Sequence, residues 1–160
     1  MAKRKDSGFT IIEVALVLAI AGLIFLVVFL AVPALQRNQR NDAIRRDIAF
    51  VAEAMSSYQS NYNALPADST GIAVPSTATT GFGQYLRDGL STNTTTIVVQ
   101  GSEALGTVPD VNNIVVMKGA KCNTGPAGVP IVEGASARNA AIVGSLDMGG
   151  ANRERYCQEM

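Results

Sequence analysis

Hydrophobic and polar positions divide the chain into an uninterrupted apolar run near the N-terminus and a longer region of mixed patterning. In the apolar run, residues 9–32, Glu13 is the only charged side chain. A helix over these residues would reach roughly 36 Å at about 1.5 Å per residue, which exceeds the ~30 Å hydrocarbon core of a bilayer. A charged group inside such a span costs about 2.5–3.5 kcal/mol on insertion scales. We therefore predict a membrane-spanning helix over residues 9–33, in which Glu13 either lies near an interface or meets a partner.

A second helical pattern follows over residues 34–62. Pro33 lacks the backbone N–H that continues a helix, so a kink is expected at or before it. Residues 36–42 are polar on every side. Beyond them, apolar residues recur in steps of three and four, the pattern of an amphipathic helix with one buried face. This stripe consists of Ile44, Ile48, Val51, Met55, Tyr58 and Tyr62. Pro66 favours a helix end within residues 63–66.

The remaining residues combine turn-rich segments with short stretches of strand chemistry. Residues 67–81 are rich in Ser, Thr, Gly, Ala and Pro and are predicted to form a surface loop, and residues 82–90 have the spacing of a short helix. Segments rich in Val, Ile and Thr predict strands. They are residues 95–100, 113–118 and 140–146, followed by a turn at 148–152 and a last strand at 153–160. The predicted fold is α+β: a long N-terminal helix, half membrane span and half amphipathic, packed against a small antiparallel sheet of three or four strands.

The residue types that carry most enzyme chemistry are scarce. The chain has no His, and its two Cys, Cys122 and Cys157, are too far apart in sequence for a zinc motif. No phosphate-binding loop, dinucleotide fingerprint or nucleophile elbow is present. We therefore expect a protein that is not an enzyme and holds no metal or cofactor. If the C-terminal region lies outside the cytoplasm, the two Cys are expected to form a disulfide; two reduced, buried thiols are the alternative.

Positive and negative charges balance over the whole chain but are unevenly spread. The formal net charge is zero, and loss of residues 1–8 would leave ten basic and twelve acidic residues. The arginines of residues 37–46 are interrupted by Asp42 and Asp47, and no broad basic surface of the kind that binds nucleic acid is evident. This segment is a solvated helix face, a surface that contacts lipid headgroups, or part of a ring of ion pairs between subunits just outside the apolar filament core. Asp42 and Arg46 have the favourable i,i+4 order for a pair within one helix. Because basic residues flank both ends of the apolar run, charge leaves its orientation open.

The residues at the start of the apolar run form a specific motif. After the basic stretch of residues 3–5 the chain reads Gly8-Phe9-Thr10-Ile11-Ile12-Glu13-Val14. The motif resembles the class III signal of type IV pilins and the related pseudopilins, specifically over residues 3–33 and only weakly beyond residue 65. The resemblance implies that a membrane prepilin peptidase cuts between Gly8 and Phe9, removes residues 1–8 and methylates the new amine of Phe9.

The resemblance also assigns roles along the helix. It matches Glu13 to the carboxylate used in assembly, and Gly22 and Pro33 to helix-softening positions, although Pro33 lies further along than in the commonest pilins. Cleavage would give Phe9 an α-amine, cationic at neutral pH because such amines have a pKa of about 7.7–8. The carboxylate four residues away can pair with this amine or with that of the next subunit, which would remove an unpaired charge from an apolar setting and fix axial register.

A structural subunit of a bacterial type IV pilus is the function that the resemblance implies. Residues 9–33 would form the filament core, residues 34–62 the amphipathic half, and residues 63–160 a globular head with a Cys-bounded, disulfide-tied C-terminal region. The implied partners are other pilin subunits in a helical filament, the prepilin peptidase, the pilus assembly platform and, before assembly, membrane lipid. The subunit would span the cytoplasmic membrane once and then join an extracellular pilus at the cell surface. The sequence does not choose among adhesion, twitching motility, DNA uptake and secretion.

Three other functions remain open at this point. A type II secretion or competence pseudopilin shares every N-terminal feature. A minor pilin with an adhesin or DNA-binding role is the second, and the weak charge pattern argues against DNA. A bitopic membrane protein with an extracytoplasmic domain is the third and accounts for the apolar run, but not for Gly8-Phe9 and Glu13 together. An ordinary secretory signal has a shorter apolar region of about 7–15 residues and a small-x-small cleavage site, which Pro33 interrupts here.

Overall fold

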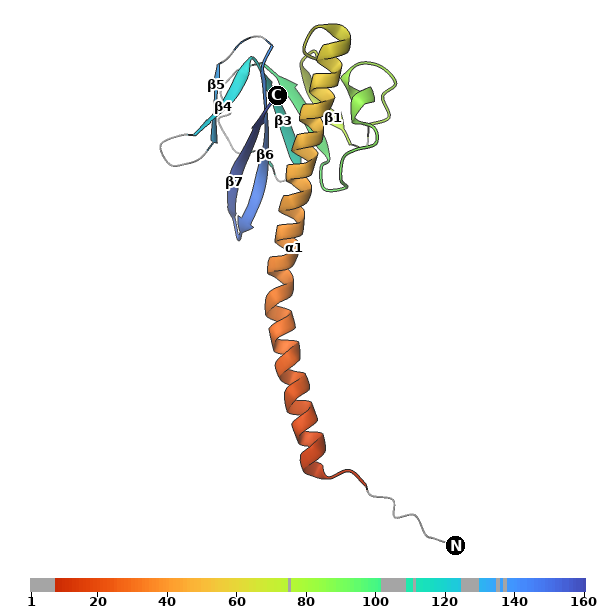
Figure 1. Ribbon diagram of the computed structural model, residues 1–160, viewed down its shortest axis with the longest axis vertical. Helices are drawn as coiled ribbons and strands as arrows, with labels where there is room; N and C mark the ends of the chain where they lie inside the picture. The colour runs from red at the N-terminus through yellow and green to blue at the C-terminus, as the bar shows by residue number, and fades with distance from the viewer. Residues whose placement is uncertain are drawn as a thin grey trace. The chain divides into compact units, whose positions relative to one another are not determined.

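One helix, α1 (Ile11–Tyr62), dominates the computed structural model (Figure 1). The structure describes residues 8–74, 76–101, 109–110, 112–124, 130–134, 136 and 138–160. The chain divides into two compact units at the boundary between Gln36 and Arg37. Both predicted helical patterns belong to α1, and Pro33 lies inside it without ending it. The kink expected at Pro33 stays a prediction.

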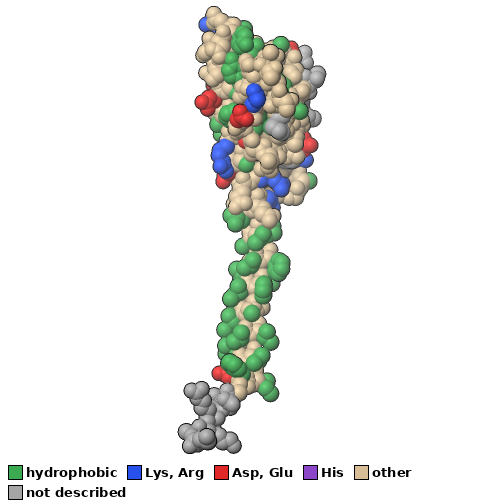
Figure 2. Space-filling model, turned by 90° about the vertical axis from the view of Figure 1, so that its right-hand side faces the viewer, with side chains coloured by type: hydrophobic (Ala, Val, Ile, Leu, Met, Phe, Trp, Pro, Cys, Tyr) green, Lys and Arg blue, Asp and Glu red, His purple; other side chains and the backbone are tan. Residues whose placement is uncertain are grey.

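Large apolar side chains are exposed along the part of α1 that belongs to the N-terminal unit. Ile11 is 91% exposed and Leu30 is 74% exposed, and Figure 2 shows hydrophobic side chains over the face of this segment that it presents. Among the described residues one helix is long and apolar enough to cross a membrane, and none of its most apolar 18-residue stretch is buried. Each such side chain gains about 1.5–3 kcal/mol when it leaves water, so this surface requires lipid or other apolar helices.

The C-terminal end of α1 is set by Asn63. This residue adopts a left-handed conformation with a φ of 53°, and its N–H donates a hydrogen bond to the carbonyl of Gln59 at 2.7 Å. A left-handed residue after the last turn is a common helix C-cap, and Asn is one of the few non-glycine residues that adopts it at low cost. The helix end predicted within residues 63–66 is confirmed.

A five-stranded sheet in the order β1-β2-β3-β6-β7 packs against the second half of α1. Its strands are β1 (Ser69–Ala73), β2 (Thr96–Gln100), β3 (Asn113–Lys118), β6 (Ala140–Gly149) and β7 (Asn152–Glu159). Strands β2 and β3 are parallel, and the other neighbours are antiparallel. A separate two-stranded antiparallel sheet consists of β4 (Ala120–Thr124) and β5 (Pro130–Gly134). The α+β class with a long helix on a mostly antiparallel sheet is confirmed.

The predicted stripe of α1 forms one side of the main core. Ile48, Val51 and Met55 are fully buried against residues of β2, β3 and β6. The helix approaches β6 closely at Gly144, where a Cβ atom would lie 2.6 Å from Cδ1 of Ile48. Tyr62, the last residue of the stripe, is 52% exposed. Its ring stacks on Tyr58 with centroids 4.5 Å apart instead of entering the core.

Several elements differ from the prediction. The sheet has five strands instead of three or four, because β1 forms within the expected loop 67–81, and it contains one parallel pair. The hairpin β4–β5 was not predicted. The short helix expected over residues 82–90 is a 3-10 helix, η1 (Phe82–Leu86). Strand β1 pairs with β2, which lies more than twenty residues away in sequence, and local hydrophobic periodicity does not reveal such pairing.

Candidate processing and assembly site

The predicted cleavage point lies in irregular backbone immediately before the helix. Gly8, Phe9 and Thr10 have no regular secondary structure. Phe9 is 89% exposed, and a Cβ at Gly8 would meet no atom within 4 Å. An endopeptidase needs an accessible segment of backbone outside regular secondary structure, and Gly8 and Phe9 provide one. The basic residues of the leader, residues 3–5, lie outside the described residues.

Thr10 and Glu13 form a reciprocal cap at the start of α1. The N–H and the hydroxyl of Thr10 each donate a hydrogen bond to Oε2 of Glu13, both at 3.0 Å. In return the N–H of Glu13 donates to Oγ1 of Thr10 at 3.4 Å. This arrangement is a capping box, in which the N-cap and the third helical residue satisfy each other's free N–H groups. Thr10 was not among the predicted functional residues, although Thr-x-x-Glu is the sequence signature of this cap.

The capping box determines how the Glu13 carboxylate is presented. Both donors reach Oε2, so the cap does not use Oε1. A carboxylate has about four lone-pair positions in all, and two of them are filled by Thr10. Glu13 can therefore begin its own helix and accept a further cation from another chain. Its predicted role in assembly stays a prediction.

Gly22 and Pro33, the predicted softening positions, both lie inside α1. A Cβ at Gly22 would meet no atom within 4 Å, so packing within the chain does not require glycine there. Pro33 removes the hydrogen bond that its N–H would donate to the carbonyl four residues earlier. Their effect on helix stability is therefore local, and a role in assembly stays a prediction.

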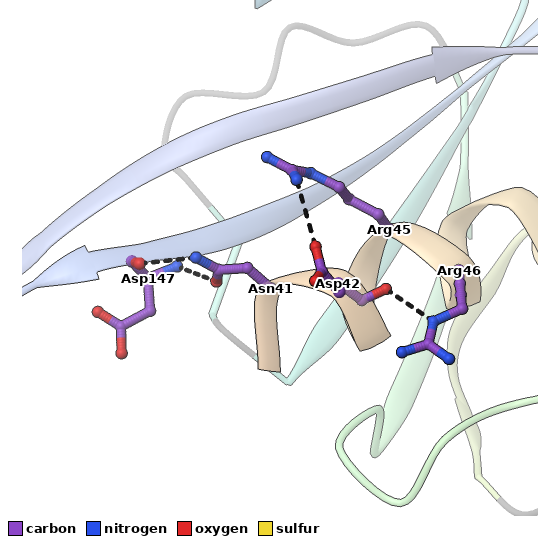
Figure 3. A network of polar contacts seen from close by, with 5 residues as sticks. All are labelled: Asn41, Asp42, Arg45, Arg46 and Asp147. Atoms are coloured by element: carbon purple, nitrogen blue, oxygen red, sulfur yellow. Dashed lines mark hydrogen bonds and ion pairs between the residues drawn. The ribbon is translucent and has the colours of Figure 1, made fainter. Parts of the chain in front are cut away.

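Polar residues connect the start of the C-terminal unit to strand β6. The amide of Asn41 forms two hydrogen bonds with the backbone of Asp147: Nδ2 donates to its carbonyl and Oδ1 accepts from its N–H, both at 2.9 Å (Figure 3). Arg40 lies 3.7 Å from the carboxylate of Asp147. The helix is thus fixed to the end of β6 by side chains that the sequence did not single out.

The expected pair between Asp42 and Arg46 is not formed. The carboxylate of Asp42 pairs with Arg45 at 3.4 Å, three residues along the helix. Arg46 instead donates from Nε to the backbone carbonyl of Asp42 at 3.2 Å (Figure 3). Residues three and four apart are both neighbours on a helix surface, so either partner is within reach. Exposed pairs of this kind contribute little to stability.

A buried carboxylate joins α1 to the segment that precedes β2. Asp47 is 2% exposed. Its Oδ1 accepts the N–H of Ser91 at 2.9 Å, and its Oδ2 accepts the hydroxyls of Ser91 at 2.6 Å and of Thr94 at 2.5 Å. The sequence prediction missed this site, although an aspartate inside an apolar stripe is a usable signal, since a buried charge requires partners.

The two Cys are bonded to each other. Cys122 on β4 and Cys157 on β7 form a disulfide with their Cα atoms 5.9 Å apart. The bond joins the two-stranded sheet to the edge of the five-stranded sheet. The predicted disulfide is confirmed, and the alternative of two reduced thiols is wrong.

One comparison with known proteins bears on the N-terminal residues. Residues 3–29 match the family described as the prokaryotic N-terminal methylation motif. No curated protein and no solved structure matches the chain. The matched residues include the accessible Gly8-Phe9 junction, the Thr10–Glu13 cap and most of the exposed apolar helix, and they fit a membrane-anchored precursor of the pilin or pseudopilin type. The chain therefore carries, at residues 3–29, the class III signal peptide of type IV pilins.

Proposed function

We propose that the chain is a prepilin whose mature form, residues 9–160, is a structural subunit of a type IV pilus. The observation that carries this proposal is the signal motif over residues 3–29 together with the apolar part of α1, whose most apolar 18-residue stretch is not buried. The helix resides in the cytoplasmic membrane before assembly and in the filament core afterwards. Both surroundings are dry, and both suit a helix because it satisfies its own backbone groups.

Two further roles follow within this proposal. Prepilin peptidase cleaves between Gly8 and Phe9 and methylates Phe9, and the assembly platform then takes up the processed subunit. Glu13 pairs with the amine of Phe9 on the neighbouring subunit, and its oxygen Oε1 is the acceptor that the capping box leaves for this purpose. The disulfide supports a pilus over a pseudopilus, because the C-terminal region of many type IV pilins is tied in this way.

The N-terminus of the protein isolated from its host tests the proposal. Mass analysis of the membrane fraction is expected to find a chain that begins at N-methylated Phe9. Electron microscopy of sheared material is expected to find long filaments that contain it. An intact Met1 would contradict processing and favour a bitopic membrane protein, whereas a processed N-terminus with only short, cell-bound fibres would favour a pseudopilin.

Replacing the carboxylate tests the role of Glu13. We expect Glu13→Ala to be inserted and cleaved normally but to yield few filaments, because each subunit would then bury an uncompensated amine at the cost of several kcal/mol. Filament yield in the sheared fraction is compared with that of Glu53→Ala, which removes an exposed glutamate from the other half of the same helix. Equal yields from the two variants would refute the assembly role.

A further inference from the structure

We propose that residues 37–46 of α1 and the β6–β7 turn, taken with the last residues of β6 as residues 147–151, form a platform that binds anionic lipid headgroups before assembly. Both parts of the platform belong to the C-terminal unit, and residues 37–46 are the first of that unit in sequence. The inference rests on the proposed function in one respect, that the apolar run spans the membrane. It adds a lipid class and the residues that recognise it.

The distribution of charge along the chain carries the inference. Residues 37–46 contain four arginines and one aspartate, a formal charge of +3, whereas residues 47–160 contain six basic and ten acidic residues, a formal charge of −4. A negatively charged membrane surface attracts the first group and repels the second. The basic residues of the C-terminal unit are therefore concentrated in the part of its sequence that follows the apolar run.

Arg37 and Arg40 follow the apolar run closely in sequence. They stand five and eight residues after Val32, the last residue of the run. Long arginine side chains near the end of a span extend to the headgroup layer. There a guanidinium group can bind a phosphate through two parallel hydrogen bonds.

The β6–β7 turn extends this platform beyond the helix. Arg37 lies over Gly149, where a Cβ would collide with its Nη1, and Asn41 and Arg40 hold Asp147. Between them Met148 is 57% exposed. An apolar side chain at the tip of a hairpin, flanked by arginines, is suited to the boundary between headgroups and acyl chains.

Arg40 remains available for a ligand in the free chain. Arg40 is 49% exposed and its contact with Asp147 is long, at 3.7 Å. An exposed pair of this kind contributes less than about 1 kcal/mol. A lipid phosphate can therefore replace Asp147 as the partner of Arg40 at little cost, while the two Asn41 bonds keep the turn in place.

A single tryptophan can report binding, because the chain contains none. Full-length protein with Met148→Trp is reconstituted into vesicles of phosphatidylcholine and into vesicles that also contain phosphatidylglycerol, each doped with brominated lipid. We expect bromine to quench the tryptophan strongly only when phosphatidylglycerol is present, and salt to weaken the effect. Tyr62→Trp, exposed at the other end of α1, is the matched reporter and is expected to remain unquenched.

Charge variants made with the Met148→Trp reporter identify the groups responsible. Arg37→Gln with Arg40→Gln should lower the ratio of lipid-bound to unbound β6–β7 turn about five-fold for each arginine removed. The corresponding Lys variants should retain most of the effect, which separates charge from packing of the turn. Arg87→Gln with Arg138→Gln removes two exposed arginines elsewhere and should change nothing.

Three outcomes would overturn the inference, and they are distinguishable. Equal quenching with and without phosphatidylglycerol would exclude recognition of anionic lipid. Quenching that follows protein density instead of lipid charge would assign the surface to contacts between copies of the chain. Failure of the protein to float with either vesicle would refute the membrane span, and with it the proposed function, whereas flotation without a lipid-charge effect overturns this inference alone.

Discussion

Thr10 shows how one short side chain can prepare a carboxylate for two tasks. Its hydroxyl and N–H hold Oε2 of Glu13 at the first turn of α1. The cap satisfies N–H groups that would otherwise be exposed to the membrane interior, where unsatisfied polar groups are costly. It also holds the Glu13 carboxylate in one orientation, so that in the filament that we propose a partner's amine would meet an acceptor that is already oriented.

Removal of the Thr10 hydroxyl should loosen the start of the helix. Thr10→Val keeps the shape of the side chain but loses both bonds made by Oγ1, and loss of an N-cap costs about 0.5–2 kcal/mol. We expect faster amide hydrogen exchange at residues 11–14 of the full-length protein in detergent, with the rest of α1 unchanged. Thr10→Ser retains the hydroxyl and should match the parent. Unchanged exchange in the valine variant would show that the capping box does not stabilise this end.

Asp47, inside the C-terminal unit, is a second carboxylate that is held by hydroxyl and N–H donors. Asp47→Ala leaves three donors of Ser91 and Thr94 without an acceptor, and each unsatisfied buried group costs about 1–3 kcal/mol. Asp47→Asn should cost less, because Oδ1 is retained and the two hydroxyls can rotate to accept from the new amide. Urea unfolding of the full chain in detergent measures both variants. An alanine variant no less stable than the asparagine variant would contradict this account.

The sequence alone indicated the residues of the N-terminal motif, but it did not indicate the partners of the polar residues in the C-terminal unit. Gly8, Phe9 and Glu13 stand at fixed spacing in a contiguous segment, so the sequence alone indicates them. Asp47 instead depends on donors more than forty residues away. Asn41 depends on a backbone position at the end of β6. Local spacing contains no information about such partners.

Among the elements, those that bury one periodic face were predictable. The three- and four-residue spacing of apolar residues from Ile44 to Met55 predicted the face of α1 that the structure buries. Strands β2, β3 and β6 were evident from their Val and Ile content. Strand β1 reads Ser-Thr-Gly-Ile-Ala and pairs with β2 through an irregular register, so its sequence lacks the alternation that identifies a strand.

The contact between α1 and β6 gives a prediction about packing. Gly144→Ala places a methyl group 2.6 Å from Cδ1 of Ile48, and overpacking of this kind typically costs 1–3 kcal/mol. Ile48→Val removes the opposing atom, so the double variant should recover much of the loss. Gly101→Ala, where a Cβ meets no atom within 4 Å, is the control and should have little effect. The free energy of unfolding is measured for the two single variants, the double variant and the control. Strictly additive losses in the double variant would exclude the proposed clash.

For the molecule as a whole, the sheet has a core on each face. The face that contacts α1 includes Ile142, whereas its neighbour Ala141 belongs to a smaller cluster with Met117, Cys122 and Cys157. Neighbouring residues of a strand point to opposite faces, so one strand contributes to both clusters. The parallel pairing of β2 and β3 and the position of β4–β5 depend on this global arrangement, which explains why strand chemistry alone did not predict them.

The disulfide should therefore stabilise the smaller cluster more than the main core. Closing a loop between residues 35 positions apart contributes about 3.8 kcal/mol in the chain-entropy model. That is a large part of the 5–15 kcal/mol typical of a domain. We expect Cys122→Ser with Cys157→Ser to lose about this amount in urea unfolding and to speed amide exchange mainly in β4 and β5. Amide exchange in the buried turns of α1 should become faster only as far as the loss of global stability requires. The reason is that Ile48 and Val51 pack on the opposite face of the sheet. Uniform exchange across both sheets would instead mean that the hairpin and the main sheet unfold as one unit, and that the bond does not stabilise the smaller cluster in particular.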